Sequence, residues 1–164
     1  MTDKTSFSTE EWAGVLQLPG AVSMYIITAS PAIGDSVKET FALAQNLADP
    51  AQKENASGLL KAVLAEFTDA GNARQAQPKM DGAQDMAGLR AMLLETVRKN
   101  VTLVDQKAEA NEANEFKMWL YKVANDTAQA AKEGDFMGIG GEKVNQAETD
   151  ALTELGTVLG VQQV

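Results

Sequence analysis

The residues from Ala13 to Gly34 carry no charged side chain, no other part of the sequence continues so far without one, and Asp35 ends the stretch. Such a segment either spans a membrane, forms the buried centre of a small domain, or lies under a partner. About 20 apolar residues suffice to span a bilayer, but this stretch contains Gln17 and Pro19 and lacks the flanks that are typical of a span. We therefore predict that it is a domain core and crosses no membrane.

Local signals divide this stretch into two expected helices. Ser8 and Glu11 have the spacing of a capping box, which predicts a helix start at Ser8. Pro19 and Gly20 are expected to end that helix, because proline lacks an N–H group and clashes with the preceding turn. A second helix is then predicted over residues 20–30. Its apolar side chains do not keep to one face, which indicates burial on all sides.

The composition favours helices throughout the chain. Aromatic residues make up only 5% of the sequence, whereas alanine, leucine, glutamate, glutamine, lysine and methionine, all good helix formers, are plentiful. A length of 164 residues fits one domain. We predict an all-α fold, a single domain over residues 1–164 built as a mostly antiparallel bundle of about six to seven short-to-medium helices.

The middle of the chain predicts two further helices and a linker. A turn over residues 30–36 precedes a helix that Asp35 or Ser36 would cap. Asp49 as cap and Pro50 at the first helical position then start a helix that we expect to run without a break to about residue 70. Residues 71–84 contain two glycines and a proline but no apolar run, so we expect a flexible or disordered linker there.

The second half of the chain contains two long apolar stripes. Residues 89–133 include neither glycine nor proline, and a polar segment near residues 108–113 separates the stripes. One helix of that length would be unusual, so we predict two antiparallel helices. Asn145 with Glu148 forms another capping box, which starts the last helix. Leu152 and Leu155 belong to the predicted buried face of that helix.

Charge and missing residue types exclude several functions. The formal net charge of −9 argues against a nucleic-acid binder, which needs a surplus of lysine and arginine. The sequence has no cysteine and no histidine, which excludes disulfides, zinc–thiolate sites, serine–histidine catalysis and the usual di-iron centre. We predict no metal and no cofactor. The polar first residues lack the order of a signal peptide, so we expect a cytoplasmic protein.

The glycine-rich turn from Gly138 to Gly141 is the one candidate site. Its members are Phe136, Gly138, Gly140, Gly141 and Lys143. Glycines before a helix can aim backbone N–H groups at an anion, and the lysine could assist. The spacing matches neither the P-loop nor the dinucleotide fingerprint, so a tight connection between helices is the favoured interpretation. The acids Glu109, Glu112 and Glu115 are interpreted as one solvated helix face.

The segment WLYKVANDTAQAAKEGDFMGIGGEKVNQAE, residues 119–148, resembles a set of small all-helical bacterial proteins of unassigned function. EEWAGVLQLP and KETFALAQ are similar to the same group. That group is expected to carry serine at the position of Asn145, and both residues are good helix caps. The resemblance implies a compact helical bundle with the AKEGxFxGxGG-type turn as a shared feature. It implies no activity and no catalytic residues.

Two functions from different classes fit these observations. The first is a non-enzymatic protein that acts through protein contacts, as a homodimer or with another partner, with part of the stripe around Trp12 and Tyr25 facing that partner. The alternative is a bundle that binds a small apolar or anionic ligand between helices or at the Gly138–Gly141 turn. An enzyme is least favoured, because no catalytic motif is present.

Overall fold

The fold is all-α, as predicted. The computed structural model describes residues 1–29, 46–47, 49–56, 58–69, 71–72, 76–78, 80–132 and 146–161. These residues form one 3-10 helix and six α-helices and include no strand. In chain order the helices are η1 (Lys4–Ser6), α1 (Thr9–Ile27), α3 (Pro50–Asn55), α4 (Gly58–Glu66), α6 (Met86–Lys107), α7 (Ala110–Lys132) and α8 (Gln146–Leu159).

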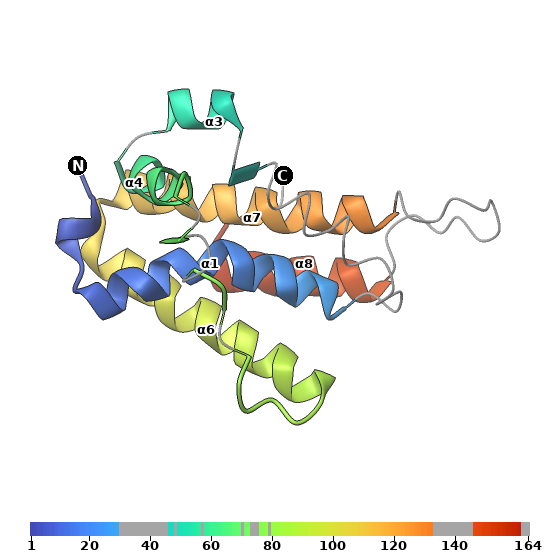
Figure 1. The fold of residues 1–164 in the computed structure, drawn as a ribbon. Helices are drawn as coiled ribbons and strands as arrows, with labels where there is room; N and C mark the ends of the chain where they lie inside the picture. Colours follow the sequence, from blue (N-terminus) through green and yellow to red (C-terminus); the bar gives the residue numbers. More distant parts are fainter. Residues whose placement is uncertain are drawn as a thin grey trace.

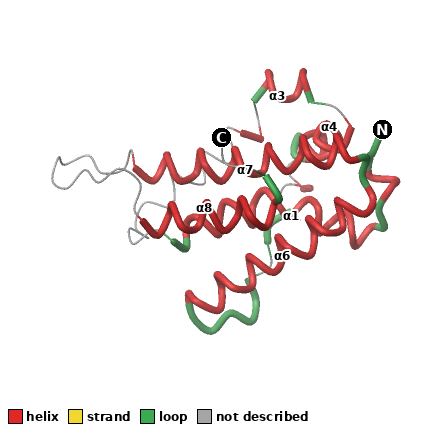
Figure 2. Tube along the Cα trace, turned by 180° about the vertical axis from the view of Figure 1, so that it is seen from behind, coloured by secondary structure: helices red, strands yellow, loops and turns green. Residues whose placement is uncertain are grey.

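Helix α1 lies at the centre of the bundle, between α6 and α7 (Figure 1). Its most extensive contacts are with these two helices, and it also packs against α8. The Asn100 side chain of α6 packs directly on Gly14 of α1, where an added Cβ would lie 2.3 Å from Oδ1 of Asn100. Helix α3 stands apart from the other helices in both views of the molecule (Figures 1 and 2).

The predicted start of α1 is confirmed. The Ser8 hydroxyl accepts from the Glu11 amide at 3.2 Å, and the Glu11 carboxylate accepts from the Ser8 amide at 2.7 Å. The rings of Phe7 and Trp12 lie beside this cap with centroids 5.6 Å apart. Together these contacts satisfy orphan N–H groups of the first turn and fix the angle at which the chain enters the helix.

The prediction of two helices separated at Pro19 and Gly20 is wrong. Pro19 lies inside α1, which continues without a break to Ile27. An interior proline costs about 3 kcal/mol, because one backbone hydrogen bond is lost and the ring clashes with the preceding turn. Leu18 and Val22 on either side are fully buried, and burying each such side chain contributes about 1.5–3 kcal/mol. Packing of both halves against the same neighbours therefore outweighs the local penalty.

The single helix predicted from residue 50 to about residue 70 is also wrong. Asp49 caps α3 as expected, accepting from the amides of Ala51 and Gln52. The chain then becomes extended at Ala56, and α4 begins at Gly58, whose φ is +46°. Periodicity could not reveal this break, since the buried residues of α4 continue the apolar spacing that precedes it.

The predicted separation of residues 89–133 into two helices is confirmed. Asp85 caps α6 by accepting from the Gly88 amide at 2.7 Å, and α6 ends at Lys107. Ala108 is extended, and α7 starts at Ala110. The two helices meet at this corner and diverge from it, so their far ends contact other parts of the bundle (Figures 1 and 2).

The uncharged stretch forms the core, as predicted, in its described part up to residue 29. Most of its large side chains are buried. Gln17, Gly20, Met24 and Ile27 form one stripe that is only half-buried, so the predicted burial on all sides is wrong. Trp12 and Tyr25 are 9% and 1% exposed. The expectation that they face a partner is therefore wrong, because other helices of the same chain cover them. No helix among the described residues combines the length and apolar character that crossing a membrane requires.

The last helix buries the predicted face. Ala151, Leu152, Leu155 and Leu159 of α8 are buried, and Val158 is half-buried against them. Asn145, the predicted cap of this helix, lies outside the described residues, as do Asp35 and Ser36, where another helix was expected to begin. In the segment 71–84, the described residue Ala76 is buried.

Truncation of one core side chain on α7 tests this packing. Leu120 is fully buried, whereas Met118 on the same helix is 54% exposed. We expect Leu120→Ala to lower the free energy of unfolding by about 2–5 kcal/mol, because a cavity is left in the core. Met118→Ala is the control and should change it by less than about 0.5 kcal/mol. Urea denaturation of both variants measures the difference, and equal losses would contradict the described packing.

Candidate functional site

The predicted candidate site lies outside the described residues. Phe136, Gly138, Gly140, Gly141 and Lys143 all fall between α7 and α8, in residues 133–145. The anion-binding and structural interpretations of this turn therefore stay predictions. The described residues contain a different candidate, a pocket beside α1.

The pocket has a volume of about 320 Å³ and is mainly apolar. It lies between α1, Phe67 just after the end of α4, residues 76–78 and Met80. The largest side chains that line it are Met24, Ile27, Leu47, Phe67, Pro78 and Met80. Met24, Leu47 and Phe67 pack against the main core on one side and are only half-buried. The pocket is thus an extension of the core toward solvent.

Residues 76–78 and Met80 form one wall of the pocket, and Pro78 packs on a glycine of α1. A Cβ added to Gly20 would lie 2.9 Å from Cδ of Pro78, so only glycine permits this approach. Ala76 is buried, and its amide donates to the Asn72 carbonyl at 3.0 Å. The wall is therefore held both by packing against α1 and by a backbone hydrogen bond near its start.

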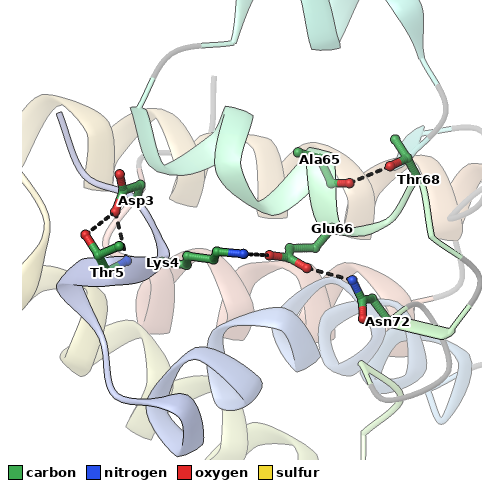
Figure 3. Close-up of polar contacts among 7 residues, drawn as sticks. All are labelled: Asp3, Lys4, Thr5, Ala65, Glu66, Thr68 and Asn72. Atoms are coloured by element: carbon green, nitrogen blue, oxygen red, sulfur yellow. Dashed lines mark hydrogen bonds and ion pairs between the residues drawn. The ribbon is translucent and has the colours of Figure 1, made fainter.

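A chain of polar contacts links this wall to the amino-terminal segment (Figure 3). Lys4 of η1 donates to one oxygen of Glu66 at 3.4 Å, and Asn72 donates to the other at 2.7 Å. The two partners approach Glu66 from different segments of the chain (Figure 3). Phe67, the next residue, lines the pocket. The contacts at Glu66 therefore hold Lys4 and Asn72 beside the residue that precedes Phe67 in the pocket wall.

A buried hydroxyl pair lies where α1 contacts both the pocket and α7. Ser23 lines the pocket and is 2% exposed, and its hydroxyl lies 3.0 Å from that of Thr127. The Thr127 hydroxyl also donates to the Val123 carbonyl at 2.8 Å. Ser23 is the only buried polar residue among the described residues that line the pocket, apart from backbone groups.

Tyr25, two residues further along α1, joins three helices. Its hydroxyl donates to Glu154 of α8 and accepts from Arg90 of α6 at 3.0 Å. The Arg90 guanidinium also lies 4.5 Å from the centre of the tyrosine ring. Burial, together with the hydrogen bond to Glu154, raises the pKa of Tyr25 to about 12. The phenol therefore stays protonated at neutral pH, and its contacts have the character of a structural link.

The interpretation of Glu112 as part of a solvated face is wrong. Glu112 is 6% exposed, and its carboxylate accepts from the Thr2 amide at 2.6 Å and from the Leu59 amide at the start of α4. Gly58 leaves the room for it, since an added Cβ would lie 2.0 Å from the Glu112 carboxyl carbon. Periodicity alone could not show this, because the groups that bury Glu112 are distant in sequence.

The electrostatics of Glu112 follow from these contacts. Burial by itself would raise the pKa of its carboxyl, but the hydrogen bonds from Thr2 and Leu59 and the nearby terminal ammonium outweigh burial and lower the pKa below its ordinary value. The terminal ammonium itself pairs with Glu109. Glu112 thus acts as a remote cap for α4 and as an anchor for the amino-terminal segment.

A wider, polar groove lies between α1 and α6, with a volume of about 800 Å³. Charged side chains of both signs line it, among them Glu10, Asp81 and Lys99, all exposed. These groups are solvated and do not converge on one point. Among the described residues, no group of three or more acidic side chains is placed to hold a metal ion. The apolar pocket is therefore the better candidate site.

Sequence reasoning placed Met24 and Ile27 in the core and missed that they border a pocket. Only a weak sequence feature could have predicted the pocket: Gly20, a small residue, lies on the helix that forms the core, and Pro78 follows much later in the chain. Nothing in the sequence alone shows that Gly20 and Pro78 touch. No family model, no curated protein and no solved structure matches this chain, so the resemblance to small bacterial helical proteins stays a prediction.

Substitution of Gly58 tests whether the Glu112 carboxylate occupies the space beside Gly58. Gly58 and Gly160 both have positive φ, +46° and +67°, but an added Cβ at Gly160 meets nothing within 4 Å. Gly160→Ala should cost only the backbone strain, about 1–2 kcal/mol. Gly58→Ala should cost about 1–3 kcal/mol more, because the carboxylate is displaced from buried amides. Urea denaturation compares the two, and equal losses would mean that the carboxylate is not seated there.

The lowered pKa of Glu112 predicts how the stability of the fold depends on pH. A carboxyl group whose pKa is lower in the folded chain stabilises the fold above its ordinary pKa of 4.5, and this contribution is lost as the pH falls through the folded-state pKa. The Glu112→Gln variant should therefore be less stable than the wild type at neutral pH. On acidification to about pH 3 it should lose less stability than the wild type does. The exposed Glu54 supplies the control, Glu54→Gln, which should follow the wild-type curve. A Glu112→Gln curve parallel to the wild type would contradict this role.

Proposed function

We propose that this chain is a helical binding protein that takes up a small apolar ligand in the pocket beside α1. The observation that carries the proposal is the pocket itself, about 320 Å³ and lined mainly by apolar side chains. Ligand sites in proteins are concave, mostly apolar and about 300–1,000 Å³ in volume. This pocket is at the lower end of that range, so a compact ligand is expected.

The volume of the pocket and the chemistry of its lining restrict the class of ligand that it can bind. An engineered apolar cavity of about 150 Å³ binds benzene, and this pocket has roughly twice that volume. A molecule with two fused rings, or a flexible chain of similar volume, fits that space. None of the described residues that line the pocket is charged. Since burying an unpaired charge is costly, the proposal favours a neutral ligand over an anionic one.

Flexible side chains support a binding role for the pocket. Two of the lining residues, Met24 and Met80, are methionines, whose unbranched side chains adapt to ligands of different shape. Met80 is 46% exposed and so reaches the surface. A ligand could therefore enter past Met80 without opening the main core.

A function through protein contacts, as a homodimer or with another partner, stays a prediction. Such a role needs a contiguous apolar surface. In the part of the chain that the structure describes, the large apolar side chains with high exposure are Met1, Met80, Met86 and Met118. They belong to different segments, and no observation singles out a patch among them. Binding of a small ligand is thus the function that the geometry supports better.

Binding can be tested by NMR of the methionine methyl groups with tetralin, a neutral hydrocarbon of two fused rings. Met24 and Met80 line the pocket, whereas Met86 and Met118 do not. We expect the methyl signals of Met24 and Met80 to shift and saturate, while those of Met86 and Met118 stay in place. Uniform shifts of all four, or none at any soluble concentration, would overturn the proposal.

Filling the pocket gives a second, independent prediction. Met24→Trp adds volume inside the pocket and should weaken tetralin binding by at least about tenfold. The control is Met118→Trp, which places the same side chain on an exposed site of α7 and should leave the affinity unchanged. Calorimetric titration measures both affinities, and urea denaturation confirms that both variants are folded. Unchanged affinity in a folded Met24→Trp variant would contradict the pocket as the site.

A further inference from the structure

Three side chains of the pocket wall are of the types that attract aromatic rings. Phe67 supplies a ring, and Met24 and Met80 supply thioethers. Met80 is 46% exposed, and Phe67 and Met24 are only half-buried. Because all three line the pocket, each retains accessible surface that a molecule in the pocket can contact.

The ring of Phe67 has no aromatic neighbour in the described part of the chain. The ring pairs found there join Phe7 to Trp12 and Phe116 to Trp119, with centroids 5.6 Å and 5.9 Å apart. Every side-chain carbon of a phenylalanine beyond Cβ belongs to the ring. The surface that Phe67 offers to the pocket is therefore mainly aromatic, and no ring of the described residues occupies it.

The physical chemistry of these side chains distinguishes aromatic ligands from saturated ones. An aromatic ring has a negative face and a positive edge, so a second ring placed offset or edge-on beside it is attracted beyond the burial of apolar area. One such contact raises an affinity by about two- to tenfold. A methionine sulfur at the edge of a ring contributes to a similar extent. A saturated ring obtains only the apolar burial, which depends on area.

We propose that the pocket takes an aromatic ligand, and that it binds an aromatic ring in preference to a saturated ring of the same skeleton or to an aliphatic chain. This inference rests on the proposed binding function and adds the chemical class of the ligand to it. Phe67, Met24 and Met80 determine the preference. Aliphatic lining residues such as Ile27 and Leu47 contact either class of ligand by apolar burial.

The test compares tetralin with trans-decalin, which has the same two fused rings but no aromatic one. Headspace gas chromatography over solutions of the full chain measures the binding of both volatile compounds. Each affinity is divided by the partition coefficient of the compound from water into hexadecane, which removes the difference in hydrophobicity between the two. The normalised affinity of tetralin should be about three- to tenfold higher than that of trans-decalin.

Substitutions in the lining assign the preference to its residues. Phe67→Leu removes the ring and should lower the preference at least about twofold. The double variant Met24→Leu with Met80→Leu replaces both thioethers by side chains of similar volume and should lower it as well. Ile27→Leu is the matched control, because it changes a lining side chain that has neither ring nor sulfur, and it should preserve the preference. Urea denaturation verifies that each variant is folded, and the double variant decides alone if Phe67→Leu is not.

The outcomes separate this inference from the function on which it rests. If both compounds shift the methyl signals of Met24 and Met80 but have equal normalised affinities, the aromatic preference is overturned and the binding function stands. A preference that is unchanged in Phe67→Leu and in the double methionine variant would also overturn the inference, since other groups would then produce it. If neither compound binds, the proposed function fails, and the inference fails with it.

Discussion

Burial of most of the surface of α1 is the constraint on which the rest of the structure depends. Helices α6, α7 and α8 each pack against it, and its own residues Leu18, Ala21 and Val22 are fully buried. Each large apolar side chain buried in this way contributes about 1.5–3 kcal/mol. Several of them together exceed the penalty of about 3 kcal/mol for Pro19 in the helix interior. Helices α6, α7 and α8 are thus arranged as a cover for one apolar helix.

Apolar burial has no direction, so it does not by itself decide how the covering helices are placed around α1. Hydrogen-bonded contacts with defined partners supply that information. Ser23 meets Thr127 of α7, and Tyr25 meets both Arg90 of α6 and Glu154 of α8. Because Ser23, Thr127 and Tyr25 are buried, a shift of one helix would leave a buried hydroxyl without its partner, at about 1–3 kcal/mol for each group.

Hydrogen bonds to a buried group also fix the placement of the amino-terminal segment and of α4. Glu112 accepts from Thr2 and Leu59, and Gly58 has no side chain that would obstruct it. Two buried indole N–H groups, on Trp12 and Trp119, have no hydrogen-bond partner within the described part of the chain. Each of these rings instead lies against a phenylalanine, with centroids 5.6 Å and 5.9 Å apart. The pocket lies where cover of α1 is incomplete, beside Gly20 and Ile27, which are only half-buried.

The sequence by itself determined what local spacing encodes. Helical content, the capping box at Ser8, the cap at Asp49, the separation of α6 from α7 and the buried face of α8 all depend on residues within a few positions of one another. Only the tertiary structure decided that α1 continues through Pro19, that the chain breaks before Gly58, that Glu112 is buried, and that Pro78 packs on Gly20 to form a pocket. Each of these depends on contacts between segments far apart in the chain, whose energies exceed local preferences and leave no periodic trace in the sequence.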